Sequence, residues 1–251
     1  MIRKIEVGWL AQGLKPAACL GLLVALAVAI APRKSAASPA HGGSSKVSSG
    51  VVFTPDKGTF KILAGGKEAG QEDFEVSPSG GDWIVRGTST IQTAKGPTHV
   101  TGTLELHPNG SPVRYEWSTD GEKTASATVT FDGPAASIAL NLANTQPYTQ
   151  QLTFGSVPVA VLDNNLYDQY AVLGDLYDWS KKGVQTFSVL VPQELTPGTV
   201  TVESLGKQDS NGKQMDELRV KTDDLELDLF FDRGRLMRIA APGSDAEIVR
   251  D

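Results

Sequence analysis

Three side chains on one predicted strand have the types that bind metal ions. His99, Glu105 and His107 fall on one face of a strand predicted over 98–107, because alternate residues of a strand point to the same side. Glu105 and His107 are neighbours on that face, but His99 lies too far along it to join them. Zinc normally takes three or four ligands. The pattern therefore favours a solvated polar strand face, and we predict no metal site.

A group of acidic residues near the C-terminus has the types that bind calcium or perform acid–base catalysis. Its members are Asp223, Asp224, Glu226, Asp228 and Asp232. Alternation places the last three on the exposed side of a strand, where acids discourage edge-to-edge aggregation. Acid–base sites instead have convergent carboxylates with perturbed pKa values. The sequence also has no nucleophile elbow, phosphate-binding glycine loop or His-Glu-x-x-His motif. We therefore predict neither an enzyme nor a cofactor.

An aromatic stripe is the one feature that predicts a binding site. Leu166, Tyr170, Leu173 and Tyr177 recur at intervals of four, three and four residues, which is the spacing of one helix face. Aromatic side chains at this spacing usually pack in a core. A helix that lines a cavity would use the same residues, and Tyr and Trp can also bind a lipid head group. We predict that Tyr170, Leu173, Tyr177 and Trp179 contact an apolar or amphiphilic ligand.

The helix that carries this stripe is predicted between residues 162 and 182. Asp163 is a candidate N-cap, and Lys181, Lys182 and Gly183 have the charge and conformational freedom expected at a helix end. The helix separates two sets of strands, so we expect it to lie across the concave face of a curved sheet.

Strands are predicted by period-two alternation that ends at turn residues. In one example, Tyr115 and Trp117 face one side of a strand that ends at the turn Asp120-Gly121. The segment 184–191 is apolar on both faces, which predicts a central strand covered on both sides. The predicted strands cover 60–64, 71–76, 82–91, 98–107, 113–119, 125–131, 136–142, 184–191, 200–205, 217–221, 225–232 and 235–240. The fold expected is mainly β: a curved antiparallel meander, either a half-barrel or a barrel, with one inserted amphipathic helix.

An apolar segment over 17–31 precedes this domain and predicts an N-terminal apolar helix. It is shorter than the ~20 apolar residues of a straight membrane span and has the length of a signal-peptide core. Cleavage after Ala37 is one alternative, and retention as a membrane anchor, which we favour, is the other. The flanking basic residues are Arg3, Lys4, Lys15, Arg33 and Lys34. We predict a signal peptide or anchor over 1–34, contacting the membrane through 17–31.

Residues 35–50 are rich in Ser, Gly, Ala and Pro, which predicts a disordered linker. Residues 51–251 then form one exported β-rich domain in the cell envelope, either periplasmic or otherwise extracytoplasmic. The only cysteine, Cys19, lies in the apolar segment. The domain therefore has no disulfide and depends on a packed core.

The order of strands, helix and strands in an exported chain resembles the half-barrel folds of outer-membrane lipoprotein carriers. The segment Gly58-Thr59-Phe60-Lys61-Ile62, with Gly66, Gly70, Phe74 and Trp83 after it, is similar to the opening of a family of uncharacterised exported β proteins. Val189-Leu190-Val191-Pro192 fits that family too. The resemblance implies a curved sheet around a helix with an apolar cavity, and, by analogy, a ligand that is an acyl chain or a lipid-bearing partner.

The net charge of −6 and the mixed distribution of acids and bases leave no basic patch. We therefore expect no nucleic-acid partner. Three functional classes follow. The favoured one is a tethered binding protein for an apolar ligand or a lipidated envelope protein. The second is a structural envelope protein with a core filled by side chains, and the least favoured is a hydrolase.

Overall fold

The computed structural model describes residues 50–121, 124–156, 158–181, 183–210, 212–223 and 225–251. The predicted signal or anchor segment 1–34 lies outside these residues, as does the predicted linker apart from Gly50. Within the described part of the chain, no helix has the length and apolar character needed to cross a bilayer.

In the part of the chain that the structure describes, fifteen strands form a single open, curved sheet, which confirms the mainly β fold. Along the sheet the strands follow the order β8-β7-β6-β5-β4-β3-β2-β1-β15-β14-β13-β12-β11-β10-β9. Their bounds are β1 Asp56–Ala64, β2 Lys67–Ser79, β3 Asp82–Thr93, β4 Gly96–Leu106, β5 Pro112–Asp120, β6 Ala125–Asp132, β7 Ala135–Leu142, β8 Tyr148–Thr153, β9 Val159–Val161, β10 Gln185–Val191, β11 Thr196–Ser210, β12 Lys213–Lys221, β13 Glu226–Asp232, β14 Arg235–Ala240 and β15 Ala246–Arg250. Neighbouring strands are antiparallel except for β9 and β10, which are parallel.

The two halves of the sheet are joined where the last strand pairs with the first. β15 lies beside β1 with Arg250 opposite Phe60. The Arg250 guanidinium donates to both carboxylate oxygens of Asp56, at 2.7 and 2.8 Å, and to the Lys57 carbonyl at 2.7 Å. It also lies over the Phe74 ring, 5.0 Å from its centre. The Arg250 side chain is only 7% exposed, and its bidentate ion pair with Asp56 holds β15 against β1.

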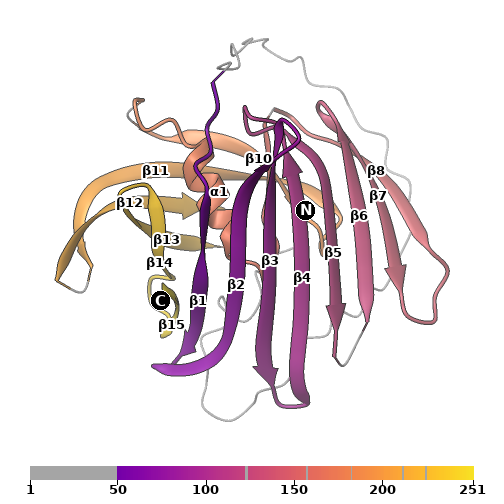
Figure 1. The fold of residues 1–251 in the computed structure, drawn as a ribbon, viewed down its shortest axis with the longest axis horizontal. Helices are drawn as coiled ribbons and strands as arrows, with labels where there is room; N and C mark the ends of the chain where they lie inside the picture. The colour runs from indigo at the N-terminus through magenta and orange to yellow at the C-terminus, as the bar shows by residue number, and fades with distance from the viewer. Residues whose placement is uncertain (1–49, 122–123, 157, 182, 211, 224) are drawn as a thin grey trace.

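The only helix in the described residues, α1 (Asp168–Leu176), lies inside the curve of the sheet. In Figure 1, α1 lies behind β1 and β2, the strands β3–β8 continue the sheet to the right, and β11 and β12 extend to the left. Two apolar clusters, one toward each half of the sheet, surround the helix. All four members of the aromatic stripe are buried: Leu166, Tyr170, Leu173 and Tyr177. The stripe therefore faces the core, as its spacing predicts.

The helix is shorter than predicted, and its ends differ. Asp163 is not the N-cap, because its carboxylate binds other partners and the helix begins five residues later. Tyr167 holds the N-cap position without a side-chain cap of its own. At the other end Tyr177 turns to an extended conformation, with φ −68° and ψ 126°. Lys181 and Gly183 therefore follow the helix and do not end it.

The strand predictions were incomplete, because β8, β9 and β15 were not predicted. The segment 184–191 was predicted to be a central strand covered on both sides. β10 lies between β9 and β11, so it has a neighbour on each side, and its residues from Phe187 to Val191 are buried. Val184 is 58% exposed and lies just outside the strand.

Candidate functional site

A carboxylate from the sheet caps the N-terminus of α1. Alternation along β2 turns Glu72 inward with Phe74 and Val76. Glu72 is fully buried, and its two carboxylate oxygens accept hydrogen bonds from the backbone N–H groups of Tyr167, at 2.6 Å, and Asp168, at 2.9 Å. The first N–H groups of a helix have no partner within the helix and carry its positive dipole end. Glu72 satisfies two of them and links β2 to α1.

The Asp168 side chain lies against the same carboxyl group. Burial, reinforced by the charge of Asp168, raises the pKa of Glu72 well above its ordinary value. Burial and the nearby Asp163 raise the pKa of Asp168 to about 7. Among the described residues, no lysine, arginine or histidine pairs with either group.

A second set of buried hydrogen bonds surrounds Asp163. Its carboxylate accepts from the Tyr115 hydroxyl at 2.9 Å, from Gln193 Nε2 at 2.7 Å and from the Asn165 N–H at 3.1 Å. The Asp163 N–H donates to Gln169 Oε1. Burial raises the pKa of Asp163, despite these donors. We call the combined group, Glu72, Tyr115, Asp163, Asp168, Gln169 and Gln193, the polar centre.

Several buried polar atoms in and around the polar centre have no hydrogen-bond partner among the described residues. They are Asp168 Oδ1, Gln193 Oε1, Ser89 Oγ and Tyr167 Oη. Ser89 lies directly opposite Glu72 in the register of β2 and β3, and both side chains are fully buried. Buried polar atoms in folded proteins almost always have partners. Asp168 and Gln193 in particular leave acceptors that a hydrogen-bond donor could satisfy.

Two glycines on adjacent strands make room for the segment that enters α1. Gly87 on β3 and Gly102 on β4 are opposite each other. A Cβ at Gly87 would lie 2.8 Å from Asp168 Oδ2, and one at Gly102 would lie 2.3 Å from Leu166 Cδ1. The segment that enters α1 can therefore pack directly against β3 and β4 only because Gly87 and Gly102 have no side chain.

We expect Gly102→Ala to lower the free energy of unfolding by about 1–3 kcal/mol, because the added methyl forces Leu166 out of a packed position. The matched control is Gly155→Ala, where a Cβ would meet nothing within 4 Å. That change is expected to stay within about 0.5 kcal/mol. Urea titration followed by tryptophan fluorescence measures both. Equal effects of the two substitutions would contradict the proposed close fit.

The four predicted ligand-binding residues lie together around α1. Tyr170, Leu173 and Tyr177 belong to the apolar cluster on the β10–β15 side. The Tyr177 hydroxyl donates to the Gly183 carbonyl and accepts from the Ser204 N–H, both at 3.2 Å. Trp179 is 43% exposed and donates from Nε1 to the Gly174 carbonyl at 3.0 Å. Tyr170, Leu173 and Tyr177 are therefore core residues in this structure. Trp179 lies at the surface, just beyond the C-terminal end of α1.

The residues considered for a metal site are held apart. His99 Nδ1 lies 3.0 Å from the Thr90 hydroxyl, and His107 Nδ1 lies 2.9 Å from Asp82 Oδ1, so both contact residues of β3. The structure's described residues contain no group of three or more histidine, cysteine or acidic side chains placed to hold a metal ion.

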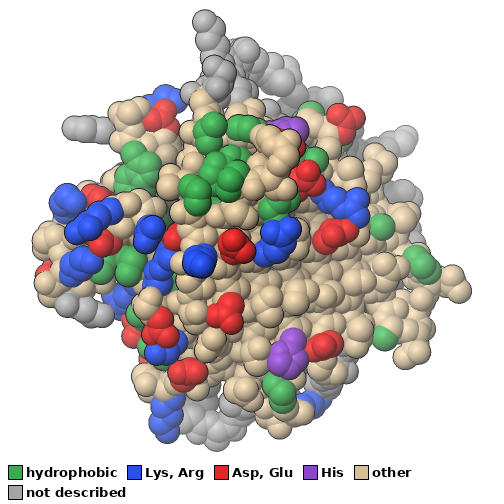
Figure 2. Space-filling model, in the orientation of Figure 1, with side chains coloured by type: hydrophobic (Ala, Val, Ile, Leu, Met, Phe, Trp, Pro, Cys, Tyr) green, Lys and Arg blue, Asp and Glu red, His purple; other side chains and the backbone are tan. Residues whose placement is uncertain are grey.

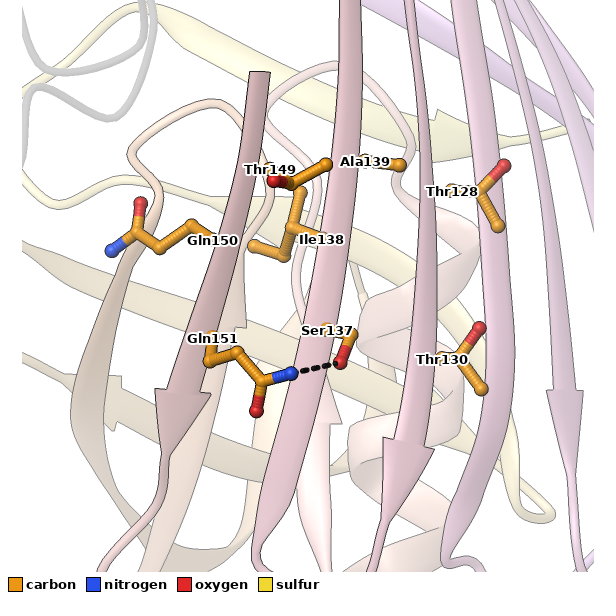
Figure 3. A pocket seen from close by; sticks show the side chains of 8 residues that line it. All are labelled: Thr128, Thr130, Ser137, Ile138, Ala139, Thr149, Gln150 and Gln151. Atoms are coloured by element: carbon orange, nitrogen blue, oxygen red, sulfur yellow. Dashed lines mark hydrogen bonds between the residues drawn. The ribbon is translucent and has the colours of Figure 1, made fainter. Parts of the chain in front are cut away.

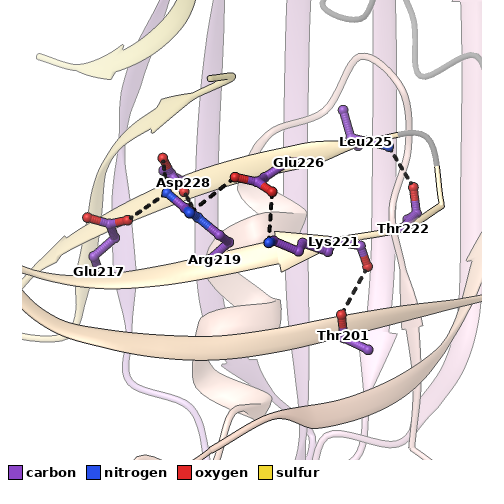
Figure 4. Close-up of polar contacts among 8 residues, drawn as sticks. All are labelled: Thr201, Glu217, Arg219, Lys221, Thr222, Leu225, Glu226 and Asp228. Carbon is purple, nitrogen blue, oxygen red and sulfur yellow. Dashed lines mark hydrogen bonds and ion pairs between the residues drawn. The ribbon is translucent and has the colours of Figure 1, made fainter. Parts of the chain in front are cut away.

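The acidic residues of β13 form cross-strand ion pairs (Figure 4). Arg219 on β12 donates to both carboxylate oxygens of Asp228, at 2.7 and 3.1 Å, and lies 3.2 Å from Glu226. Lys221 pairs with Glu226 at 2.9 Å, and Lys213 with Asp232 at 2.7 Å. Asp224 lies outside the described residues. These carboxylates are neutralised by bases and have no arrangement suited to glycoside hydrolysis.

A shallow hollow of about 280 Å³ lies on the outer face of β6, β7 and β8 (Figure 3). Hydroxyl and amide side chains dominate its lining, including Thr128, Thr130, Ser137 and Gln151. It is smaller than a usual ligand pocket and is not lined by the predicted binding residues. This surface is therefore separate from the polar centre.

Comparisons of the chain with protein-family models, with curated proteins and with solved structures gave no match. The site is therefore defined by the geometry of this chain alone. Sequence reasoning missed Glu72 and Asp168. A signal for Glu72 was present, because Gly70, Glu72, Phe74 and Val76 share one face of β2 and the other three are uncharged.

Proposed function

We propose that this protein is an exported, membrane-tethered binding protein that holds an amphiphile within a β half-barrel. The observation that carries the proposal is the polar centre, a small set of convergent polar groups surrounded by two apolar clusters. Sites for small ligands commonly combine an apolar lining with a few polar groups that fix orientation. In this proposal the polar centre binds the head group and the apolar clusters contact the chain.

The chemistry of the polar centre favours a head group that donates hydrogen bonds. Glu72, Asp163 and Asp168 are all acids, and no basic side chain pairs with them among the described residues. A phosphate or carboxylate head group would add a further negative charge in a region of low dielectric. A hydroxyl or amino head group could instead donate to Asp168 Oδ1 and Gln193 Oε1.

Ligand binding in this proposal requires a movement of α1. Tyr170, Leu173 and Tyr177 fill the interior beside the helix, so an acyl chain must take the place of some of these contacts. The N-terminal end of α1 is held by Glu72, whereas Trp179 lies at the exposed rim beyond its C-terminal end. We propose that the C-terminal end of α1 shifts, while the Glu72 contact keeps the polar centre in place.

The structural envelope role is a second candidate, and the burial of Tyr170, Leu173 and Tyr177 favours it. If the core is permanently filled, the domain serves as a rigid unit that presents its outer surface to envelope partners. The two functions differ in one respect, because only the first requires an amphiphile to reach the interior.

Photolabelling in phospholipid vesicles tests the proposal on the full chain. The probes are a diazirine analogue of monooleoylglycerol, whose head group donates hydrogen bonds, and the matching analogue of oleate, which is anionic. We expect the first probe to label peptides that contain α1 and β2, and the second to label them at least several-fold less. Glu72→Gln should weaken this labelling, whereas Glu75→Gln, on the exposed face of the same strand, should leave it unchanged. Equal labelling by both probes, or labelling confined to the apolar segment 17–31, would refute the proposal.

A further inference from the structure

β8 is an edge of the sheet, and its outer side is accessible. It occupies one end of the strand order and pairs only with β7. Thr149, Gln151 and Thr153 are exposed, and Tyr148 is 46% exposed. In Figure 3, Gln150 points away from the neighbouring strands. β11 approaches β8 but forms no ladder with it. The edge therefore presents backbone groups that another strand could pair with.

This edge lacks the features that usually prevent such pairing. Proteins protect exposed edges with charged side chains, prolines or bulges. No charged residue occurs anywhere from 133 to 162, and no proline lies within β8. The register between β7 and β8 shows no bulge. In Figure 2, few charged side chains are seen on the part of the outer face toward β6–β8.

The other edge of the sheet is different. β9 has three residues, Val159–Val161, and all three are buried. Its pairing with β10 is the one parallel pairing among the described strands. A partner strand therefore finds no comparable access there, and pairing is restricted to β8.

We infer that β8 is the surface at which two copies of this chain associate, through antiparallel pairing of their β8 strands. In this pairing Gln150 lies opposite the partner's Gln150. The inward-facing side chains of both β8 strands then lie on one face of the joined sheet, and the outward-facing side chains lie on the other. Tyr148 then lies beside the partner's Leu152, which places a half-exposed aromatic ring against an apolar neighbour. Leu142, 37% exposed at the end of β7, extends this apolar area.

A second copy of the chain fits this edge better than a charged partner would. The chain carries a net charge of −6, so two copies repel each other over most of their surfaces. The region 133–162 is the long uncharged part of the domain, and pairing through it brings no like charges face to face. This association is independent of the proposed ligand site, because β8 contributes no residue to the polar centre.

Disulfide cross-linking of the full chain in membrane vesicles tests the inference. All variants carry Cys19→Ser, so that the introduced cysteine is the only one. Gln150→Cys should give a cross-linked dimer on mild oxidation, whereas Thr130→Cys, exposed on the outer face of β6 two strands away, should give at least tenfold less. Adding Gln151→Lys to the Gln150→Cys chain should reduce the dimer several-fold, because it puts like charges across the join.

Cross-linking at both positions to the same extent would overturn the inference, since it would indicate contact through the face and not the edge. The absence of a dimer from Gln150→Cys would also overturn it, provided that this variant binds the membrane and shows the circular dichroism of the parent chain. Insensitivity of the dimer to Gln151→Lys would exclude the strand pairing specifically.

Discussion

Replacing Glu72 with alanine is expected to lower the free energy of unfolding by about 3 kcal/mol. The substitution removes the acceptor of two buried N–H groups at the start of α1, and each unsatisfied buried donor costs about 1–3 kcal/mol. Part of this loss is offset, because folding of the Glu72→Ala chain no longer includes the free-energy cost of burying a carboxyl group. Urea titration of the full chain, followed by tryptophan fluorescence, measures the change.

Glu75→Ala is the matched control, since it removes the same side chain from an exposed position on β2. We expect its effect to stay within about 0.5 kcal/mol. Glu72→Gln should have an intermediate effect, because an amide keeps one acceptor oxygen. A Glu72→Ala chain as stable as the Glu75→Ala chain would show that the cap contributes nothing to stability.

Stability is expected to fall as pH rises from about 4 to about 8, by an amount on the order of a few kcal/mol. Burial raises the pKa of Asp168 from 3.8 to about 7, and it raises the pKa of Glu72 in the same direction. At a pH between the unfolded and the folded pKa of such a carboxyl, the folded chain keeps a proton that the unfolded chain has lost. The stabilisation is therefore complete below the unfolded pKa and is lost as pH passes through the folded pKa.

Other groups add to this slope or act outside its range. Asp163 and Asp175 also have raised pKa values, the latter to about 7 because of burial and the charge of Asp56. Asp178 has its pKa lowered to about 2 by bonds to Ser180 and Lys181, so its effect appears in more acidic solutions. Unfolding curves between pH 4 and pH 8 measure the slope. Asp168→Asn should flatten it, and an unchanged slope in that variant would assign the effect to other carboxyls.

The arrangement of the strands was largely predictable, because most of them alternate clearly. Tyr115 and Trp117 face the core as their spacing indicates. β8 was missed because Gln150 occupies an inward-facing position, which interrupts the apolar pattern. β9 is too short to show a period, with three residues. Such strands are defined by their neighbours in the sheet and not by their own composition.

The aromatic stripe was predictable, whereas the polar centre was not. The stripe depends on spacing within one helix, which the sequence displays directly. The polar centre joins Glu72 to Asp168, 96 residues apart in the chain, and Tyr115 to Asp163, 48 residues apart. Only the curvature of the sheet around α1 brings these groups together. An inward-facing acid on an otherwise apolar strand face was the one signal that could have revealed part of the site.

The measurement that tests the central proposal most directly is mass spectrometry of an organic extract from the full chain, isolated from its native membranes without denaturant. The proposal predicts a stoichiometric amphiphile with a hydroxyl or amino head group. This species should be lost from the Glu72→Gln chain and retained by the Glu75→Gln chain. A folded chain that carries no amphiphile would contradict the proposal and support a structural role with a permanently filled core.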